Sequence, residues 1–484
     1  MGYGFRAHRM GGPAVYAHDL MRELAARGHH VAYFFTGRHY PLTPRDRLHR
    51  WRRGRVAMRE VVNSTLLWGG EYGTRTPAAD LDHPPSERLF ERTLEEQRPD
   101  VVHVQELIGL PTSLIDLARG RGIPVAMTLH DYFTLCPTLT LWDTEDRICM
   151  RPDVGEQCAR CSAGAPASRR RFFLETAGFE LRRAIGPQRA RPLAERAIRL
   201  VGHPNAPPAA PDPAPGPLPP PAPPAAYQSR RDENVARLSR ADLLIAQSHR
   251  AGEIYATLGV DPGRIRVIHS TIRHLERIRP RASAPPPPPV RFVAPNGCSS
   301  VPKGSDLVTG AMEELHRRGL AGSALRLTVL GPIAPAARER LGRIPGVELR
   351  GEYAPDELDR VLDGFHAGIV PSACEEVYGY VGLELLAKGL PVIGTARGGI
   401  TDYVRDGETG WLVRDVTPAG LADTMAAAVA DPRRMAEMSR AIVAARDSLT
   451  RSFDAHVDEI ETVYRELRPR TAATGSAMRS ASSQ

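Results

Sequence analysis

The chain has 484 residues, which is enough for two or three domains that each bury a full core. Its 42% hydrophobic and 25% charged residues are typical of a soluble globular protein, and no run of about 18 apolar residues indicates a transmembrane helix. The net charge of +8 comes without a recognisable nucleic-acid-binding motif, so we expect no nucleic acid as a partner.

The first half of the chain alternates apolar runs with amphipathic stretches. Apolar residues recur at helical spacing from Val15 to Arg27, and Gly28 follows as a C-cap signal, so we predict a helix there. A second helix is predicted from Pro111 to Gly120. Strands are predicted for the apolar runs 31–35, 100–104, 124–129, 241–246 and 265–269. Strands that alternate with helices favour a parallel, doubly wound α/β sheet.

Two proline-rich segments interrupt this pattern. Residues 203–226 are mostly proline and alanine and cannot form a core, so we predict a disordered or polyproline II insertion within the first domain. Residues 280–289 separate two α/β patterns and are predicted to form an interdomain hinge. The predicted domains are 1–279 and 290–450, followed by a helix at 451–467 and a disordered tail at 468–484.

The second domain is predicted to contain a second sheet of the same kind. Its strands are expected at 290–294, 325–330, 347–349, 368–370 and 392–393. Helical stretches near 418–431 and 433–467 are expected to close it.

One segment of the second domain carries recognisable chemistry. Glu376 and Glu384 stand eight positions apart. We expect a strand to end at Pro371 and a tight turn to carry Glu376. A helix is then expected to start near Tyr380 and to carry Glu384 in its first turn. The N–H groups and positive dipole end of a helix start suit a phosphate, and carboxylates suit sugar hydroxyls, so the segment predicts a nucleotide-sugar site.

Other motifs place this segment in a wider pattern. They are Gly389-Leu-Pro-Val-Ile, Gly398-Gly-Ile-Thr-Asp402, Asp406-Gly-Glu-Thr-Gly-Trp-Leu-Val413, Lys303-Gly304, His130-Asp131 and Gly11-Gly12. With the paired glutamates, they make the chain resemble glycosyltransferase family 4, whose members are retaining enzymes of the GT-B fold, with two Rossmann-like domains facing across a cleft. The resemblance covers most of the chain apart from the proline-rich insertions and the tail. It implies that the helix at 451–467 returns to the first domain.

The resemblance implies a role for each matching position. Glu376 would accept hydrogen bonds from the donor sugar, and His130 would face the transferred sugar and the donor phosphate. Lys303 would stabilise charge on the departing diphosphate, and Glu384 would hold the ribose hydroxyls. The other implied donor-binding residues are Gly11, Gly12, Tyr378, Gly379, Tyr380, Val381, Gly398 and Gly399.

The chain departs from the family pattern in three places, the mildest of which is Asp402, where glutamate is usual. The family has a strand before the Gly11 position, but residues 2–7 can supply at most a ragged strand, so we expect that the chain lacks its native first strand. Many members also have an arginine where this chain has Gly297 and Cys298. On this pattern Lys303 would carry the positive charge at the donor phosphate.

Basic residues are distributed unevenly. Lys303 and Lys388 are the only lysines among the 64 basic residues, and the others are arginines. Seven arginines and Trp51 gather between Arg45 and Arg59. This cluster is interpreted either as a solvated surface or as a contact for anionic lipid head groups or an anionic acceptor. The second interpretation predicts peripheral contact with the inner face of the cell membrane.

Four of the six cysteines lie close together in the sequence, at Cys136, Cys149, Cys158 and Cys161. A Cys-x2-Cys pair with two further thiols could hold a structural zinc ion. Free thiols that pack as small hydrophobic groups are the alternative. No catalytic metal and no other cofactor is required.

We therefore predict a retaining, metal-independent hexosyltransferase that uses a nucleoside diphosphate sugar. Its acceptor would be a hydroxyl of a glycan, a lipid-linked sugar or a small molecule, as in polysaccharide biosynthesis. The N-terminus lacks a basic region followed by an apolar core, so we expect a cytoplasmic protein. The alternatives are a catalytically impaired GT-B protein that binds nucleotide sugars, and a GT-B epimerase or phosphorylase.

Overall fold

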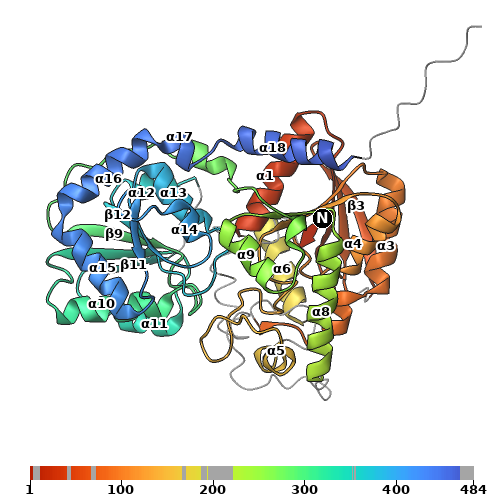
Figure 1. The fold of residues 1–484 in the computed structure, drawn as a ribbon, viewed down its shortest axis with the longest axis horizontal. Helices are drawn as coiled ribbons and strands as arrows, with labels where there is room; N and C mark the ends of the chain where they lie inside the picture. The colour runs from red at the N-terminus through yellow and green to blue at the C-terminus, as the bar shows by residue number, and fades with distance from the viewer. Residues whose placement is uncertain are drawn as a thin grey trace, which may run out of the picture.

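The computed structural model shows two lobes joined side by side, with the N-terminal lobe in red to green and the C-terminal lobe in teal to blue (Figure 1). It describes residues 1–3, 11–40, 45–66, 72–165, 170–186, 193, 222–351, 353 and 356–468. Most of the predicted proline-rich insertion (203–221) and nearly all of the predicted tail (469–484) lie outside these residues.

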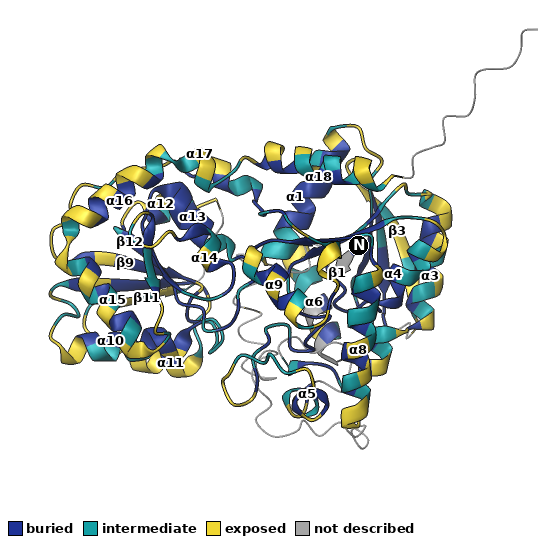
Figure 2. Cartoon of the chain, viewed as in Figure 1, coloured by how far each residue is buried: buried dark blue, intermediate teal, exposed yellow. Residues whose placement is uncertain are grey.

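The second lobe contains a six-stranded parallel sheet in the order β11-β10-β9-β12-β13-β14. Its strands are β9 (Val290–Pro295), β10 (Leu325–Leu330), β11 (Val347–Gly351), β12 (Ala367–Val370), β13 (Val392–Thr395) and β14 (Gly410–Val413). The interior strands β12 and β13 are buried along their whole length, because helices cover both faces of the sheet (Figure 2). The predicted strands of this domain are therefore confirmed.

Helices connect these strands, and most of them expose an outer face, whereas the helix at Tyr380–Lys388 is largely buried (Figure 2). They are α10 (Ser305–Arg317), α11 (Pro335–Leu341), α12 (Leu358–Leu362), α13 (Tyr380–Lys388), α14 (Ile400–Tyr403), α15 (Pro418–Ala430) and α16 (Pro432–Ala444). The stretch predicted as one helical region at 433–467 is divided into α16, α17 (Arg446–Leu449) and α18 (Phe453–Leu467).

The first lobe contains two four-stranded sheets, in the orders β1-β2-β4-β3 and β5-β6-β7-β8. The first is built from β1 (Gly2–Tyr3), β2 (Ala32–Thr36), β3 (Arg47–Arg53) and β4 (Val56–Val62). The second is built from β5 (Val102–Val104), β6 (Val125–Leu129), β7 (Leu243–Ala246) and β8 (Ile265–Val267). The antiparallel hairpin β3–β4 was not predicted, because its arginine-rich sequence hid the strand pattern.

The residues Met1 to Tyr3 link the two sheets of the first lobe. β1 pairs in parallel with β2. On its other side, the Met1 ammonium group donates to the backbone oxygen of His103, at 2.8 Å, and the N–H of Gln105 donates to the Met1 carbonyl, also at 2.8 Å. Burial lowers the pKa of the Met1 ammonium group to about 5. The described part of the predicted ragged strand is thus a short strand between β2 and β5.

The helices of the first lobe surround these sheets (Figure 1). They are α1 (Gly12–Ala26), α2 (Pro77–Leu81), α3 (Pro84–Gln97), α4 (Ser113–Gly120), α5 (Gly155–Cys161), α6 (Arg170–Ile185), α8 (Pro224–Arg240) and α9 (His249–Thr257), with short 3-10 turns η2 (Pro262–Arg264) and η3 (Arg273–Arg277). The prediction of disorder for 203–226 is wrong at its end, because α8 begins at Pro224, where proline is tolerated in a first helical turn.

The last helix, α18, packs against the first lobe rather than the second (Figure 1). Its Asp458 accepts a hydrogen bond from Arg27, the residue directly after α1, at 2.5 Å. The hydroxyl of Tyr464 lies 2.6 Å from Nδ1 of His103, and the His456 ring lies 2.8 Å from the Tyr16 hydroxyl. The chain therefore crosses between the lobes twice.

Candidate functional site

The loop after β12 and the turn before α10 bring Glu376 and Lys303 together. β9 and β12 are neighbours in the sheet, so their carboxyl ends meet at one edge. Nζ of Lys303 lies 2.5 Å from Oε1 of Glu376, and the Ser372 hydroxyl donates to the same oxygen at 2.8 Å. The side chain of Glu376 is 15% exposed and that of Lys303 is 36% exposed.

Glu376 is a carboxylate at neutral pH. Burial raises its pKa, but the Lys303 ammonium group and the hydrogen bonds from Lys303 and Ser372 together lower the pKa by more, so it lies below its usual value. An ionised carboxylate accepts hydrogen bonds without offering any, which suits the hydroxyls of a sugar. Its neighbouring cation suits a phosphate.

The backbone at Glu376 is held by the loop Gly398–Gly399. The N–H of Gly399 donates to the Glu376 carbonyl at 2.7 Å, and the N–H of Gly398 donates to Oε2 of Glu375 at 2.6 Å. A Cβ on Gly398 would lie 1.9 Å from the Glu376 carbonyl oxygen, so only glycine allows this approach. In this structure the N–H groups of both glycines, which the family resemblance places at the donor, donate to protein oxygens.

Helix α13 begins at Tyr380, as the sequence predicts, and Gly379 precedes it with φ 82°. The prediction that Glu384 lies in the first turn is wrong by one position, because Glu384 is the fifth helical residue and begins the second turn. Oε1 of Glu384 lies 2.6 Å from Nε2 of His274 in η3. Val381, one residue into the helix, packs with Tyr380 against the apolar core.

Gly12 of the first lobe lies directly opposite the start of α13. A Cβ on Gly12 would lie 2.7 Å and 2.9 Å from two ring carbons of Tyr380, so the two lobes touch here. Gly11, with φ 147°, faces open space. The structure therefore brings the Gly11–Gly12 pair to the helix start from the other lobe, in the relation that the family resemblance implies.

His130 lies at the C-terminal end of β6, between two glutamines. Its Nε2 lies 2.9 Å from Oε1 of Gln105, and its Nδ1 lies 2.6 Å from Nε2 of Gln247. Burial, and secondly His456, lower the pKa of His130 to about 3. The ring is therefore neutral, and these partners assign its proton to Nε2.

The two glutamines were not singled out in the sequence, although a signal was present. Gln105, His130 and Gln247 each follow directly the last residue of β5, β6 and β7, which are adjacent parallel strands. Side chains at such carboxyl ends share one edge of the sheet. Gln247 also accepts a hydrogen bond from the Tyr380 hydroxyl, at 3.2 Å, so it joins His130 to the second lobe.

Further contacts between the lobes surround Tyr378. The Ser248 hydroxyl donates to the carbonyl of Val377 at 2.6 Å, and Arg250 pairs with Glu375 at 3.0 Å. The Tyr378 ring stacks on His269 with centroids 5.6 Å apart and planes inclined by 10°. Ser248, Arg250 and His269 lie next to the predicted donor-binding segment but belong to no motif quoted from the sequence.

The structure explains why an arginine cannot occupy the positions of Gly297 and Cys298. A Cβ on Gly297 would lie 2.9 Å from two ring carbons of Pro371. Cys298 is fully buried in the core of the second lobe. A side chain at position 297 would displace Pro371, where the loop that carries Glu376 begins, and a cationic side chain at position 298 would be buried in this apolar core.

The cysteines of the first lobe are neighbours in space, and all six cysteines of the chain are free thiols. Burial raises the pKa of Cys158, and Cys136, Cys161 and Cys149 raise it further. In the described part of the chain, these sulfurs are not among the groups of three or more metal-ligating atoms within 4.8 Å of one another. The structural zinc ion stays a prediction.

A cavity of about 420 Å³ opens between α1 and η3. Its lining includes Asp19, Arg22 and His274, but neither Glu376 nor Lys303. His274 therefore stands between this cavity and Glu384.

Comparisons with known proteins agree with this architecture. A sequence profile described as "Glycosyl transferase 4-like domain" matches residues 11–184, and one described as "Glycosyl transferases group 1" matches residues 292–431. The chain belongs to glycosyltransferase family 4 and has the GT-B fold.

Among curated proteins, the chain is 32% identical over 227 residues to a D-inositol 3-phosphate glycosyltransferase of Nocardia farcinica, covering 43% of this chain and 49% of the relative. It is 32% identical over 256 residues to one of Acidothermus cellulolyticus, covering 49% of this chain and 56% of the relative. The chain thus spans about half the length of the curated relatives it matches.

Among solved structures, sucrose-phosphate synthase from Thermosynechococcus elongatus matches with a TM-score of 0.58 and 18% identity, over 96% of this chain and 95% of that one. Anabaena HepE in complex with UDP and glucose matches with a TM-score of 0.55 and 12% identity, over 96% and 99%. At such low identity these matches establish the fold alone.

Proposed function

We propose that the protein is a retaining glycosyltransferase that moves a hexose from a nucleoside diphosphate sugar to an acceptor hydroxyl. The observation that carries the proposal is the ionised pair of Glu376 and Lys303 at the sheet edge, with the start of α13 beside it and Gly12 opposite. A carboxylate for sugar hydroxyls and a cation for phosphate are thus held in one place. Family membership supports this assignment.

Each of the three charged residues would have a separate role in the reaction. Glu376 accepts hydrogen bonds from the sugar ring, and Glu384 accepts them from the ribose. The bond between the sugar C1 and the diphosphate oxygen breaks, and Lys303 stabilises the negative charge that collects on the diphosphate. The acceptor oxygen bonds to C1 on the same face, and its proton passes to the departing phosphate. Lys303 supplies the charge that a metal supplies elsewhere, which supports a metal-independent reaction.

The donor would require the lobes to part before it binds. The Tyr380 ring lies against Gly12, and the His274 ring contacts the Glu384 carboxylate that would bind the ribose. We infer that the ribose displaces His274 and that the lobes close again over the bound donor, which excludes water. The linker at 280–289 is the proposed hinge.

A screen for donor and transfer activity tests this function. Nucleoside diphosphate sugars are first tested by thermal shift, because a ligand that binds the folded protein raises its melting temperature. Each binder is then incubated with polyol and sugar acceptors, among them inositol phosphate because of the names of the curated relatives. Released nucleoside diphosphate is measured, and the anomeric configuration of the product is determined by NMR.

Glu376→Gln and Glu408→Gln provide the matched comparison, since Glu408 is exposed in the same lobe. We expect transfer with retention by the Glu408→Gln protein and none by the Glu376→Gln protein. Binding without transfer to any acceptor would indicate a nucleotide-sugar-binding protein instead. Interconversion of free nucleotide sugars, or consumption of phosphate, would indicate an epimerase or a phosphorylase.

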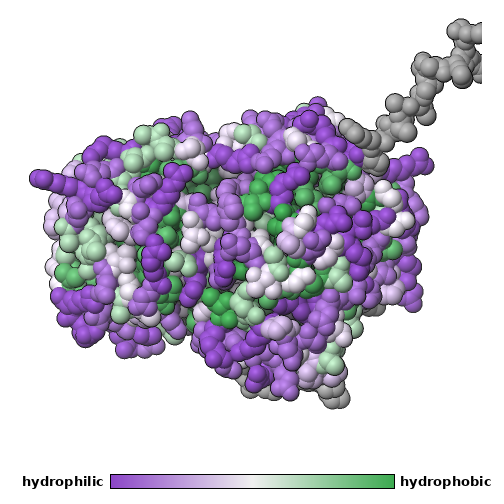
Figure 3. Space-filling view, in the orientation of Figure 1, coloured by the Kyte–Doolittle hydropathy of each residue, from purple (hydrophilic) through white to green (hydrophobic). Residues whose placement is uncertain are grey.

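Contact with a membrane surface is a separate part of the proposal. Strand β3 exposes Arg47, Arg52 and Arg53, which supports contact with anionic lipid head groups or an anionic acceptor. Arg50 and Arg59 instead pair with Glu96. Hydrophilic residues cover most of the face shown in Figure 3. Within the ranges that the structure describes, none of the helices combines the length and apolar character needed to cross a membrane.

A further inference from the structure

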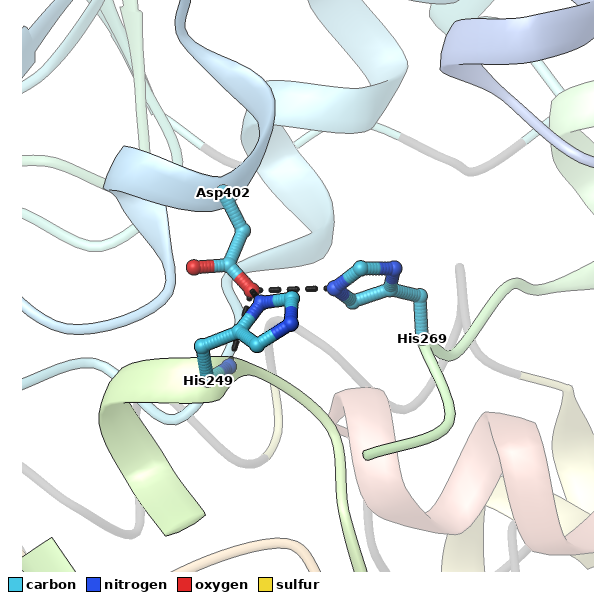
Figure 4. Close-up of side chains that lie close together, drawn as sticks. All are labelled: His249, His269 and Asp402. Carbon is cyan, nitrogen blue, oxygen red and sulfur yellow. Dashed lines mark hydrogen bonds and ion pairs between the residues drawn. The ribbon is translucent and has the colours of Figure 1, made fainter. Parts of the chain in front are cut away.

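His249, His269 and Asp402 form a compact group between the two lobes. His249 is the first residue of α9, His269 follows β8, and Asp402 belongs to α14 of the second lobe. Their side chains point toward one another (Figure 4). One ligand atom from each residue lies within 4.8 Å of the other two. In the described part of the chain, no other group of three or more metal-ligating residues has this arrangement.

One carboxylate oxygen is the centre of the group. Oδ2 of Asp402 lies 3.0 Å from Nδ1 of His249 and 2.9 Å from Nε2 of His269. The backbone N–H of His249 donates to the same oxygen at 2.9 Å. Both imidazoles therefore turn a nitrogen toward a single point.

The group is reachable from solvent although its carboxylate is buried. The side chain of Asp402 is 7% exposed, while those of His249 and His269 are 67% and 39% exposed. An ion can approach from the histidine side. The His269 ring is held by stacking on Tyr378, and the backbone of His249 is held by Asp402, so two of the three ligands are already oriented.

We propose that His249, His269 and Asp402 bind a divalent transition metal ion of the zinc class, and that this ion joins the two lobes. Two imidazoles and one carboxylate are the ligands of three-coordinate protein sites that leave a position for water. Magnesium and calcium prefer oxygen ligands and are not expected to bind here.

The geometry needs little adjustment. Zinc lies about 2.0–2.2 Å from nitrogen and carboxylate ligands, so tetrahedral ligand atoms lie roughly 3.3–3.5 Å apart. The two observed distances to Oδ2 are 3.0 Å and 2.9 Å, which are hydrogen-bond lengths. The exposed His249 side chain can move by the few tenths of an ångström that separate the observed distances from those of a zinc site. A metal ion can then take the place of the hydrogen-bonding proton.

The site depends on closure of the lobes, because His249 and His269 come from the first lobe and Asp402 from the second. A bound ion would therefore stabilise the closed arrangement beside Tyr378, next to the proposed donor site. Zinc binding itself does not depend on the proposed transferase activity, so the two proposals can fail separately.

Zinc titration of the full chain, free of any affinity tag and stripped of metal, tests the proposal. Zinc is delivered from a chromophoric chelator, and the number of ions bound per chain and their affinity are measured. The variants are His249→Ala from the first lobe and Asp402→Asn from the second. His316→Ala is the matched control, because His316 is exposed on α10, far from the group in sequence and structure.

We expect the wild-type and His316→Ala proteins to bind one zinc ion more than the other two variants, or to bind it at least about tenfold more tightly, as loss of one ligand predicts. Zinc held by the cysteines would contribute equally to all four proteins and cancel in the comparison. Equal zinc binding by all four proteins, or binding by none, would overturn the proposal.

Cobalt provides a second measurement that identifies the ligands. Co²⁺ bound by nitrogen and oxygen ligands shows visible d–d absorption without the sulfur-to-metal charge-transfer band of a thiolate site. We expect this spectrum in the wild-type protein and its loss in His249→Ala. A spectrum that is the same in His249→Ala as in the wild type, with or without a thiolate band from the cysteines, would overturn the proposal.

Discussion

Replacement of Lys303 by methionine would test whether the Lys303–Glu376 pair is an energetic unit. The substitution keeps an unbranched side chain but removes the ammonium group that lies 2.5 Å from Oε1 of Glu376. A hydrogen bond to a charged group contributes about 1.5–3 kcal/mol. Because 36% of the Lys303 side chain is exposed, solvent screening favours the lower end of this range. We expect the free energy of unfolding to fall by about 1.5 kcal/mol at pH 7.

The pH dependence gives the sharper test. In the wild type, the lowered pKa of Glu376 contributes stability that is present above the usual carboxyl pKa and is lost as the pH falls through the folded value. In Lys303→Met, burial remains and the cation is gone, so the pKa of Glu376 should rise above its usual value. The difference in unfolding free energy between the variant and the wild type should therefore be smallest at acidic pH. Its destabilisation should shrink as the pH falls from 7 toward 4.5.

Urea unfolding at several pH values measures this difference, and the double variant Lys303→Met/Glu376→Gln completes a mutant cycle. The neutral amide needs no cation, so the double variant should recover most of the lost stability. A stability loss that is the same at every pH, or a double variant as unstable as Lys303→Met, would refute this reasoning.

Three further substitutions have defined outcomes. Gly12→Ala should press a methyl group against the Tyr380 ring and hold the lobes apart, lowering transfer by about 10²-fold in steady-state assays with little change in melting temperature. Gln247→Leu should leave Nδ1 of the buried His130 without its hydrogen-bond donor. We expect the unfolding free energy, measured by urea titration, to fall by about 1–3 kcal/mol. Arg230→Met should cost about 3–5 kcal/mol by the same method, because Asp80 at 0% exposure loses a partner at 2.7 Å; burial already raises the pKa of Asp80, so this loss should shrink in acid.

Local patterns predicted the strands of the second lobe and the helices α1, α4 and α13, because the physics of these elements is local. Helix α13 begins at Tyr380 as expected, since Gly379, with positive φ, precedes a mostly apolar and buried run. The hairpin β3–β4 escaped prediction because β3 is mostly exposed and rich in arginine, β4 is mostly buried, and neither strand alternates buried with exposed positions. The stretch 433–467 was not divided into α16, α17 and α18, although Ser452 is a local N-cap signal for the start of α18.

Site residues could be predicted where they follow adjacent parallel strands, because the ends of such strands lie at one edge of the sheet. Lys303 and Glu376 follow adjacent strands, and the same rule would have found Gln105 and Gln247 beside His130. The contact of His274 with Glu384 joins residues 110 positions apart from a short turn and a helix. It depends on how the lobes dock, so the sequence gives no signal for it.

Glu376 is proposed to bind the donor sugar and Glu384 the ribose, and calorimetric titration tests these two roles most directly. The nucleoside diphosphate sugar selected by the screen and its free nucleoside diphosphate are titrated into the wild type, Glu376→Gln and Glu384→Gln. We predict that Glu384→Gln weakens both ligands, whereas Glu376→Gln weakens the sugar-bearing ligand and leaves the free diphosphate unchanged. Equal effects of Glu376→Gln on both ligands, or affinities that neither substitution alters, would contradict the account.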